Sequence, residues 1–227
     1  MERAAHLGSS SQLQFRTLKS DLTERIVTVT RECFVYGLLV LLANVAIADE
    51  AVLENGSAVD GVTLMIGDKR QWDTVVGAES ISSASGYLSA EPDTANGAVN
   101  AIWNGKGEAQ IFLAHDGPKD HSELLEQDAA LVVLMQVVSP PKRKVVIKMG
   151  CGYPCAANAD ISKLLKALPV DEWLRVSFDL KCFADGGLNI KNVDTPFLLT
   201  TAGKMAVSIS DVSIVPGAGG GATIRCR

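Results

Sequence analysis

The sequence has few aromatic residues and no excess of basic ones. Aromatic side chains make up 5% of its 227 residues, and 26 Asp and Glu against 21 Lys and Arg give a net charge of -5. A chain without a basic excess competes poorly for a phosphate backbone at cellular salt, so nucleic acid is not expected as a partner. With 47% hydrophobic residues the chain can bury a full core, which excludes bulk disorder.

Two catalytic motifs are also missing. The chain after residue 48 has no Gly-x-Ser-x-Gly sequence, which carries the nucleophile of many serine hydrolases, and no Cys-x-x-Cys redox pair. A serine hydrolase of that class and a thiol oxidoreductase are therefore not expected.

One uncharged run, from Cys33 to Ala48, is shorter than the roughly 20 apolar residues that cross a bilayer. It follows Arg25 and Arg31 and ends in Ala46-Ile47-Ala48, the small-residue pattern of a signal peptidase site. We interpret residues 1–48 as a leader and signal peptide and expect a secreted or periplasmic protein that leaves the membrane after cleavage. An uncleaved membrane anchor is the alternative, and a misassigned start codon would explain the long polar leader.

Four cysteines follow the signal, and an even number suits disulfides in an oxidising compartment. Glycine and proline between Cys151 and Cys155 favour a tight turn that could join these two sulfurs, which leaves Cys182 and Cys226 as the second candidate pair. Three connectivities remain possible from sequence alone. A zinc site is the alternative, although the cysteine spacing is poor for metal ligation.

The rest of the chain predicts many short strands. Apolar, β-branched or alternating stretches recur about every ten residues between Gly, Pro, Asn and Asp, which is typical of a sandwich or barrel. The stretches are Val62–Ile66, Ala98–Trp103, Glu108–Leu113, Ala130–Val138, Lys144–Met149, Trp173–Leu180, Phe197–Thr201 and Met205–Val215. In the last, strict alternation places Val207, Ile209 and Asp211 on one face and Ser208, Ser210 and Val212 on the other.

Only Asp160–Leu168 predicts a helix, with Asp160 as its cap and Pro169 after its end. The sandwich domain is expected over residues 49–217. The tail of residues 218–227 is rich in glycine, and we expect it to be disordered unless Cys226 is paired.

Several motifs, in order, resemble the C-terminal β-sandwich domain of bacterial exo-β-glucanases and β-glucosidases of glycoside hydrolase family 3. They are WNGKGEAQIFL (103–113), ALVVLMQVV (130–138), VVIKMGCGYPC (145–155), DISKLLKALP (160–169), EWLRVSFDLKCF (172–183) and TPFLLTTAGKMAVSISDVSIVP (195–216). The resemblance implies an all-β jelly-roll sandwich of the galactose-binding-like type with one short connecting helix. It also implies an accessory, non-catalytic role that includes binding of β-glucan-type polysaccharide.

The catalytic part of those enzymes is absent. Their (β/α)8 barrel takes about 250 residues, more than this whole chain has. No Ser-Asp-Trp nucleophile motif occurs, so no catalytic residue carries over.

Candidate sugar-binding residues are exposed aromatic rings, which stack on pyranose faces, and polar groups that bond the hydroxyls. Trp173 opens a strand and is expected in the core. Three polar residues stand in mid-strand among apolar neighbours, where an ordinary wet outer face is the alternative explanation. The candidates are Trp72, Trp103, Gln110, Gln136, Lys148 and Tyr153.

Two metal sites are further hypotheses. The resemblance implies a structural calcium at Asp211 on the final strand, with Asp60 or Asp68 completing the oxygen ligands. The segment His115–Glu123 holds two histidines and several carboxylates, which could bind a catalytic metal, although Gly117 and Pro118 indicate a solvated loop.

We therefore expect a secreted carbohydrate-binding or accessory module whose partner is a polysaccharide or oligosaccharide. The alternatives are a small glycan-active hydrolase or metal-dependent enzyme, and a support domain for a separate glycoside hydrolase chain.

Overall fold

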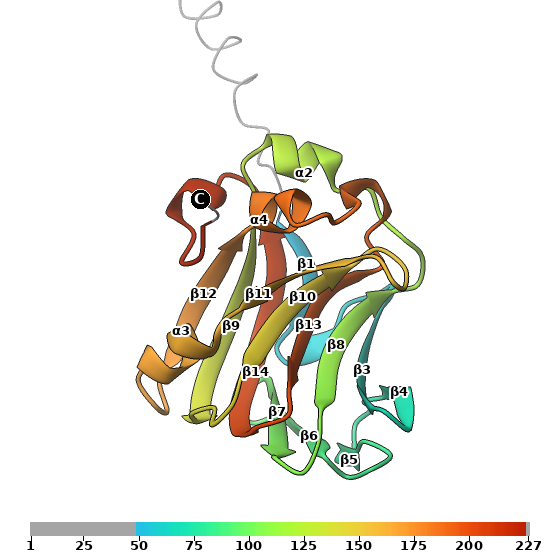
Figure 1. Ribbon diagram of the computed structural model, residues 1–227, viewed down its shortest axis with the longest axis vertical. Coiled ribbons are helices and arrows are strands. Elements are labelled where there is room, and N and C mark those ends of the chain that lie inside the picture. Colours follow the sequence, from blue (N-terminus) through green and yellow to red (C-terminus); the bar gives the residue numbers. More distant parts are fainter. Residues whose placement is uncertain (1–48, 226–227) are drawn as a thin grey trace, which may run out of the picture. The chain divides into compact units, whose positions relative to one another are not determined.

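The computed structural model describes residues 49–225, which form a sandwich of two antiparallel sheets (Figure 1). Sheet A has the order β12 (Trp173–Asp179), β9 (Ala130–Ser139), β14 (Lys204–Val215), β7 (Ala98–Asn104), β6 (Leu88–Asp93) and β5 (Ile81–Ser82), with β1 (Glu50–Glu54) beside β14 and β2 (Ser57–Ala58) beside β1. Sheet B has the order β11 (Ala156–Asp160), β10 (Val145–Gly150), β13 (Thr195–Thr201), β8 (Ala109–His115), β3 (Val62–Asp68) and β4 (Gln71–Val75). The predicted all-β sandwich is confirmed.

All eight predicted stretches are strands, with ends that shift by one or two residues. The strands that were not predicted are β1, β2, β4, β5, β6 and β11. They are short or polar, as in β4, where four of the five residues are exposed. Such strands lack the apolar alternation on which the prediction depends.

Within the described part of the chain, three short α-helices join the strands, so the expectation of a single helix is wrong. The predicted helix is α3 (Ser162–Ala167), and Asp160 accepts a hydrogen bond from its Ser162 N–H at 2.9 Å. The others are α2 (Ser122–Glu126) and α4 (Leu180–Asp185), which lie together at one end of the sandwich in Figure 1. Helices of five or six residues show little helical period in the sequence, and the prediction of α3 was helped by Asp160 before it and Pro169 after it.

A bulge in β14 changes which of its residues face the core. The pairing with β9 shifts register between Ile209 and Asp211, so Val207 and Ile209 are buried before the shift, and Val212 and Ile214 after it. The expectation that Asp211 shares a face with Ile209 is therefore wrong. An extra residue in a bulge reverses the alternation beyond it.

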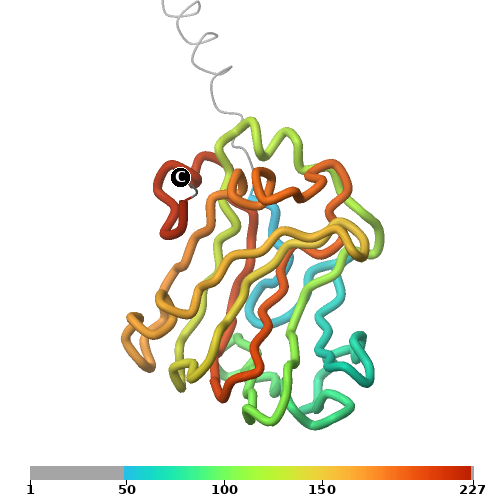
Figure 2. Tube along the Cα trace, viewed as in Figure 1, coloured from blue at the N-terminus to red at the C-terminus, as the bar shows by residue number. Residues whose placement is uncertain are grey.

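The glycine-rich tail packs on the sheet as far as Ile224. Disorder was expected only if Cys226 is unpaired, and Cys226 lies outside the described residues. Gly219 N–H bonds the backbone oxygen of Asp128 at 2.7 Å, and Ile224 N–H bonds that of Ser177 at 3.0 Å. A Cβ on Gly219 would lie 2.7 Å from the Asp128 carboxylate, so only glycine allows this approach. Figure 2 shows the segment beside β12.

Two predictions fall outside the described residues: the leader and signal peptide of residues 1–48, and a disulfide that uses Cys226. Within residues 49–225, no helix is long and apolar enough to cross a bilayer.

Candidate functional site

A row of side chains crosses the outer face of sheet A, the face that points away from the core. Trp173 pairs with Gln136, Gln136 with Ser208, Ser208 with Asn100, and Asn100 with Glu91. Residues directly opposite in antiparallel strands point to the same side of a sheet. Four strand spacings of about 4.8 Å make this row, which we call the sheet A row, about 19 Å long.

A shallow pocket of about 320 Å³ lies over the middle of the row. Its lining is both polar and apolar, and Ser208 donates a hydrogen bond from its hydroxyl to the Asn100 side-chain oxygen at 2.5 Å. The pocket is lined by Asp93, Asn100, Ile102, Gln136, Val138, Asp171, Ala206, Val207 and Ser208. Amide, hydroxyl and carboxylate groups around a floor with exposed apolar patches suit a ligand that has both hydroxyls and C–H faces.

Two carboxylates are among the residues that line this pocket. Hydrogen bonds from Asn96 lower the pKa of Asp93, so this side chain carries its charge at neutral pH and accepts hydrogen bonds. Asp171 has a positive φ of 61° and is held there by a hydrogen bond from its N–H to the backbone oxygen of Val137 at 3.0 Å. Asp tolerates this backbone conformation better than most residues. The loop before β12 thus brings a carboxylate to the pocket.

The predicted environments of Trp173 and Trp103 are both wrong, because each is in the environment that was expected for the other. Trp103 was expected at a surface turn but is fully buried between the sheets, so a sugar ring cannot reach it. Trp173 was expected in the core but is 37% exposed, because the core-facing residues of β12 are Val176 and Phe178, and Trp173 has the opposite parity.

Most of the other predicted residues lie on sheet B. Gln110 and Lys148 belong to β8 and β10 of that sheet and are partly exposed. Trp72, on β4, is 46% exposed, and Tyr153 is fully exposed on the cysteine turn. Both rings are therefore on the surface, as expected. Of the six candidates, only Gln136 belongs to the sheet A row.

The sequence profile of a family described as galactose-binding domain-like, Exop_C, matches residues 63–214. The match covers more than half of the chain. The chain belongs to the Exop_C family.

The Exop_C domain is similar in structure to several carbohydrate-active proteins. It superimposes on the extra C-terminal domain of the exo-1,3/1,4-β-glucanase ExoP from a Pseudoalteromonas species with a TM-score of 0.58 and 14% identity, covering 74% of this chain and 92% of that domain. The full-length enzyme gives a TM-score of 0.61 and 13% identity over 74% of this chain, which spans about 20% of the enzyme. These likenesses support the fold.

A family 30 carbohydrate-binding module from a cellulase of Clostridium thermocellum gives a TM-score of 0.55 at 16% identity, covering 75% of this chain and 98% of the module. The predicted galactose-binding-like jelly roll is therefore confirmed. No curated protein matches the chain in sequence.

The Exop_C domain has the disulfide that the sequence predicts between Cys151 and Cys155. It closes the turn between β10 and β11, and Asn189 donates its N–H to the Cys151 sulfur at 3.3 Å. Cys182 on α4 is also disulfide-bonded. Cys226, its candidate partner from the sequence, is outside the described residues.

Asp68 and Asp211, two of the aspartates considered for a calcium site, have separate hydrogen-bond partners. Asp68 is fully buried, and its oxygens accept hydrogen bonds from Arg70 N–H and from the N–H and hydroxyl of Ser85. Asp211 accepts hydrogen bonds from Asn55 N–H and the Ser210 hydroxyl. Among residues 49–225, the only group of three potential metal-ligating side chains contains none of these aspartates. Calcium stays a prediction.

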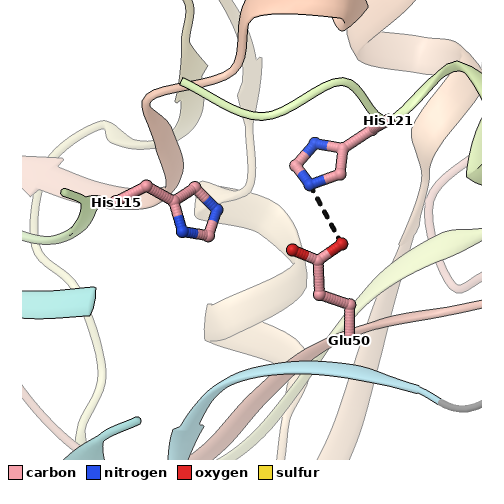
Figure 3. Close-up of side chains that lie close together, drawn as sticks. All are labelled: Glu50, His115 and His121. Atoms are coloured by element: carbon pink, nitrogen blue, oxygen red, sulfur yellow. Dashed lines mark ion pairs between the residues drawn. The ribbon is translucent and has the colours of Figure 1, made fainter. Parts of the chain in front are cut away.

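That group is formed by Glu50, His115 and His121, and Figure 3 shows the three side chains pointing toward one another. The sequence singled out both histidines, but it missed Glu50, which lies 65 or more residues away along the chain. Nothing in a single sequence indicates this proximity, because it depends on how β1 of one sheet meets β8 of the other.

Proposed function

We propose that this Exop_C domain is a non-catalytic carbohydrate-binding module that binds β-glucan-type chains along the outer face of sheet A. The observation that carries the proposal is the sheet A row: an exposed tryptophan at one end, and an amide, a hydroxyl and a second amide in line with it. This combination suits a pyranose chain, which presents C–H faces for stacking and hydroxyls for hydrogen bonds.

The comparisons support the ligand class. Two of the similar structures are a carbohydrate-binding module and the extra C-terminal domain of a β-glucanase. The motif resemblance to glycoside hydrolase family 3 enzymes points to the same kind of polysaccharide. We propose that the domain serves such an enzyme after export, either as part of a larger system or beside a separate catalytic chain.

Two exposed rings lie elsewhere: Trp72 on β4, at one edge of sheet B, and Tyr153 on the turn between β10 and β11, at the other edge. We favour sheet A because the pocket lies there and because Trp173 is in register with Gln136 and, through it, with polar groups on further strands. Trp72 has no register partner on β3, since the β3–β4 pairing is irregular at that point. The rings of sheet B therefore provide matched controls.

Affinity electrophoresis tests the proposal. The purified protein should migrate more slowly in gels that contain a soluble mixed-linkage β-glucan, with a dissociation constant in the micromolar to millimolar range, because a shallow surface gains little per sugar ring. Trp173→Ala should abolish most of the retardation, while Trp72→Ala should leave it unchanged. No retardation by β-glucans, xylans or galactans would favour the support role for a separate catalytic chain. Loss of retardation in Trp72→Ala alone would move the site to sheet B.

A further inference from the structure

A buried cluster of three side chains joins the two sheets at one end of the sandwich. Glu50 begins β1 of sheet A, His115 ends β8 of sheet B, and His121 immediately precedes α2. One ligand atom from each lies within 4.8 Å of the other two, and His121 Nε2 lies 3.1 Å from Glu50 Oε2. The three groups face a common point (Figure 3).

The two imidazoles are buried without well-aligned hydrogen bonds. His115 is 7% exposed and His121 is 1% exposed. Among the described residues, none of their four ring nitrogens makes a hydrogen bond of good geometry. The contact between His121 and Glu50 is close enough for an ion pair but does not have hydrogen-bond geometry. A buried polar group without a hydrogen-bond partner destabilises a fold, and native folds rarely contain several in one place. A cation bound by one nitrogen of each ring would satisfy two of them.

The backbone holds both histidines in place. His115 N–H bonds the backbone oxygen of Asp194 at 2.8 Å, and His121 N–H bonds that of Ile190 at 2.9 Å. Between them, Lys119 and Val193 exchange two backbone hydrogen bonds. Residues 116–120 are exposed, so the segment is the solvated loop that Gly117 and Pro118 indicated. Only the two histidines at its ends are buried, and these backbone hydrogen bonds fix their positions, as a metal site requires of its ligands.

We propose that Glu50, His115 and His121 bind one Zn²⁺ ion that ties β1 of sheet A to β8 of sheet B. Two imidazoles and one carboxylate suit Zn²⁺, whereas Ca²⁺ and Mg²⁺ prefer oxygen ligands. Ligands at 2.0–2.1 Å from a tetrahedral zinc are about 3.3 Å apart. The pair Glu50 and His121 already has about this spacing, and the His115 ligand atom needs to move closer to each of the other two by at most about 1.5 Å.

Lys119 supports the same arrangement. Its Nζ donates to Glu50 Oε1 at 3.0 Å, which leaves Oε2 for the ion and fixes the orientation of the carboxylate. Metal-bound carboxylates commonly have such a partner. The Glu50 and Lys119 side chains are 25% and 47% exposed, so an ion can enter from their side.

The zinc site is separate from the proposed sugar site. Ile214, the register partner of Glu50, lies six residues along β14 from Ser208, which corresponds to about 20 Å along the strand. Zinc binding is therefore a structural property that does not depend on the proposed function, and the two can fail independently.

The test is a Zn²⁺ titration of the purified chain, first stripped of metal with a chelator, followed by calorimetry and thermal unfolding. We expect one Zn²⁺ per chain and a rise in Tm of several degrees at saturation, and no rise with Ca²⁺ or Mg²⁺. His115→Gln, His121→Gln and Glu50→Gln should each weaken binding by at least about 100-fold, and Lys119→Ala by about tenfold, as is usual for a group that orients a ligand. Glu54→Gln, an exposed acid on the same strand, is the matched control and should bind as the wild type does.

A second measurement guards against variants that fail to fold. The stripped wild-type protein should bind Co²⁺ and gain the visible absorption of a four-coordinate or five-coordinate ion, and Zn²⁺ should displace it in a one-to-one ratio. Absence of Zn²⁺ binding to the wild type, absence of the cobalt spectrum, or undiminished Zn²⁺ binding in folded His115→Gln and His121→Gln would each overturn the proposal.

Discussion

The indole Nε1–H of Trp103 donates a hydrogen bond to the backbone oxygen of Ala109 at 2.9 Å, which links β7 of sheet A to β8 of sheet B. Thr200 donates its hydroxyl to the same oxygen at 3.1 Å. Trp103 is fully buried and is the largest side chain of the core. One buried tryptophan therefore connects sheet A to sheet B in a chain that has few aromatic residues.

Trp103→Ala should destabilise the fold by about 3–5 kcal/mol, because it removes a large buried side chain and leaves a cavity. Trp72→Ala, at an exposed position on β4, should change the free energy of unfolding by less than about 0.5 kcal/mol. Urea unfolding followed by circular dichroism measures both. Equal stability of the two variants would contradict the assignment of Trp103 to the core.

Asp68 should make the fold sensitive to acid. Burial raises its pKa, but hydrogen bonds from Arg70 N–H, Ser83 and Ser85 outweigh this effect and lower the pKa to about 2, from an ordinary value of 3.8. A carboxyl with a lowered pKa in the folded state stabilises the fold above pH 4, and this contribution is lost as the pH falls from about 4 to 2.

The variant Asp68→Asn isolates this effect. It should lower stability by roughly 1–3 kcal/mol near pH 6, since an amide replaces one acceptor oxygen with a donor. Tm measured from pH 6 to pH 2 should show the gap to the wild type narrowing below pH 4. A gap that is independent of pH would mean that the Asp68 charge contributes nothing to the fold.

The Cys151–Cys155 disulfide should contribute modestly to stability. A cross-link across so short a loop removes about 2 kcal/mol of unfolded-state entropy. The double variant Cys151→Ser/Cys155→Ser is a better test than a reducing agent, because Cys182 is also disulfide-bonded. Urea unfolding of this variant should show a free energy of unfolding lower by about 2 kcal/mol, with the fold retained. Two free thiols at Cys151 and Cys155 in the exported wild-type protein would refute the disulfide.

Export should remove the leader. Mass spectrometry of the exported protein should find an N-terminus at Asp49 or within a few residues of it, because the apolar run ends in Ala46-Ile47-Ala48. Recovery of an intact membrane-embedded chain that begins at Met1 would contradict this and favour the uncleaved anchor.

Sequence alone predicted the strands that alternate or are continuously apolar, because burial leaves that pattern directly in the residues. It failed where geometry changes the pattern. The bulge in β14 places Asp211 on a different face from Ile209, and no residue in that stretch indicates a bulge. The residue type also does not indicate that Trp103 points into the core and Trp173 points to the surface, since both are tryptophans near the ends of strands.

The candidate site was predicted only in part for a related reason. Gln136 was found because a polar residue within the apolar strand β9 is conspicuous, but Asn100 and Ser208 join it only through strand pairing. The same holds for Glu50 beside His115 and His121, which approach through the contact of two sheets. Long-range register is set by the whole fold, so local sequence patterns do not contain it.

The three tryptophan indoles provide the most direct test of the proposed sugar site. In an NMR titration of the ¹⁵N-labelled protein with a mixed-linkage β-glucan oligosaccharide, each indole N–H gives one signal, which the corresponding Trp→Phe variant assigns. The signal of Trp173 should move progressively on binding, while those of buried Trp103 and of Trp72 on sheet B should stay in place. Movement of the Trp72 signal with an unchanged Trp173 signal, or no movement at millimolar oligosaccharide, would contradict a sugar site on sheet A.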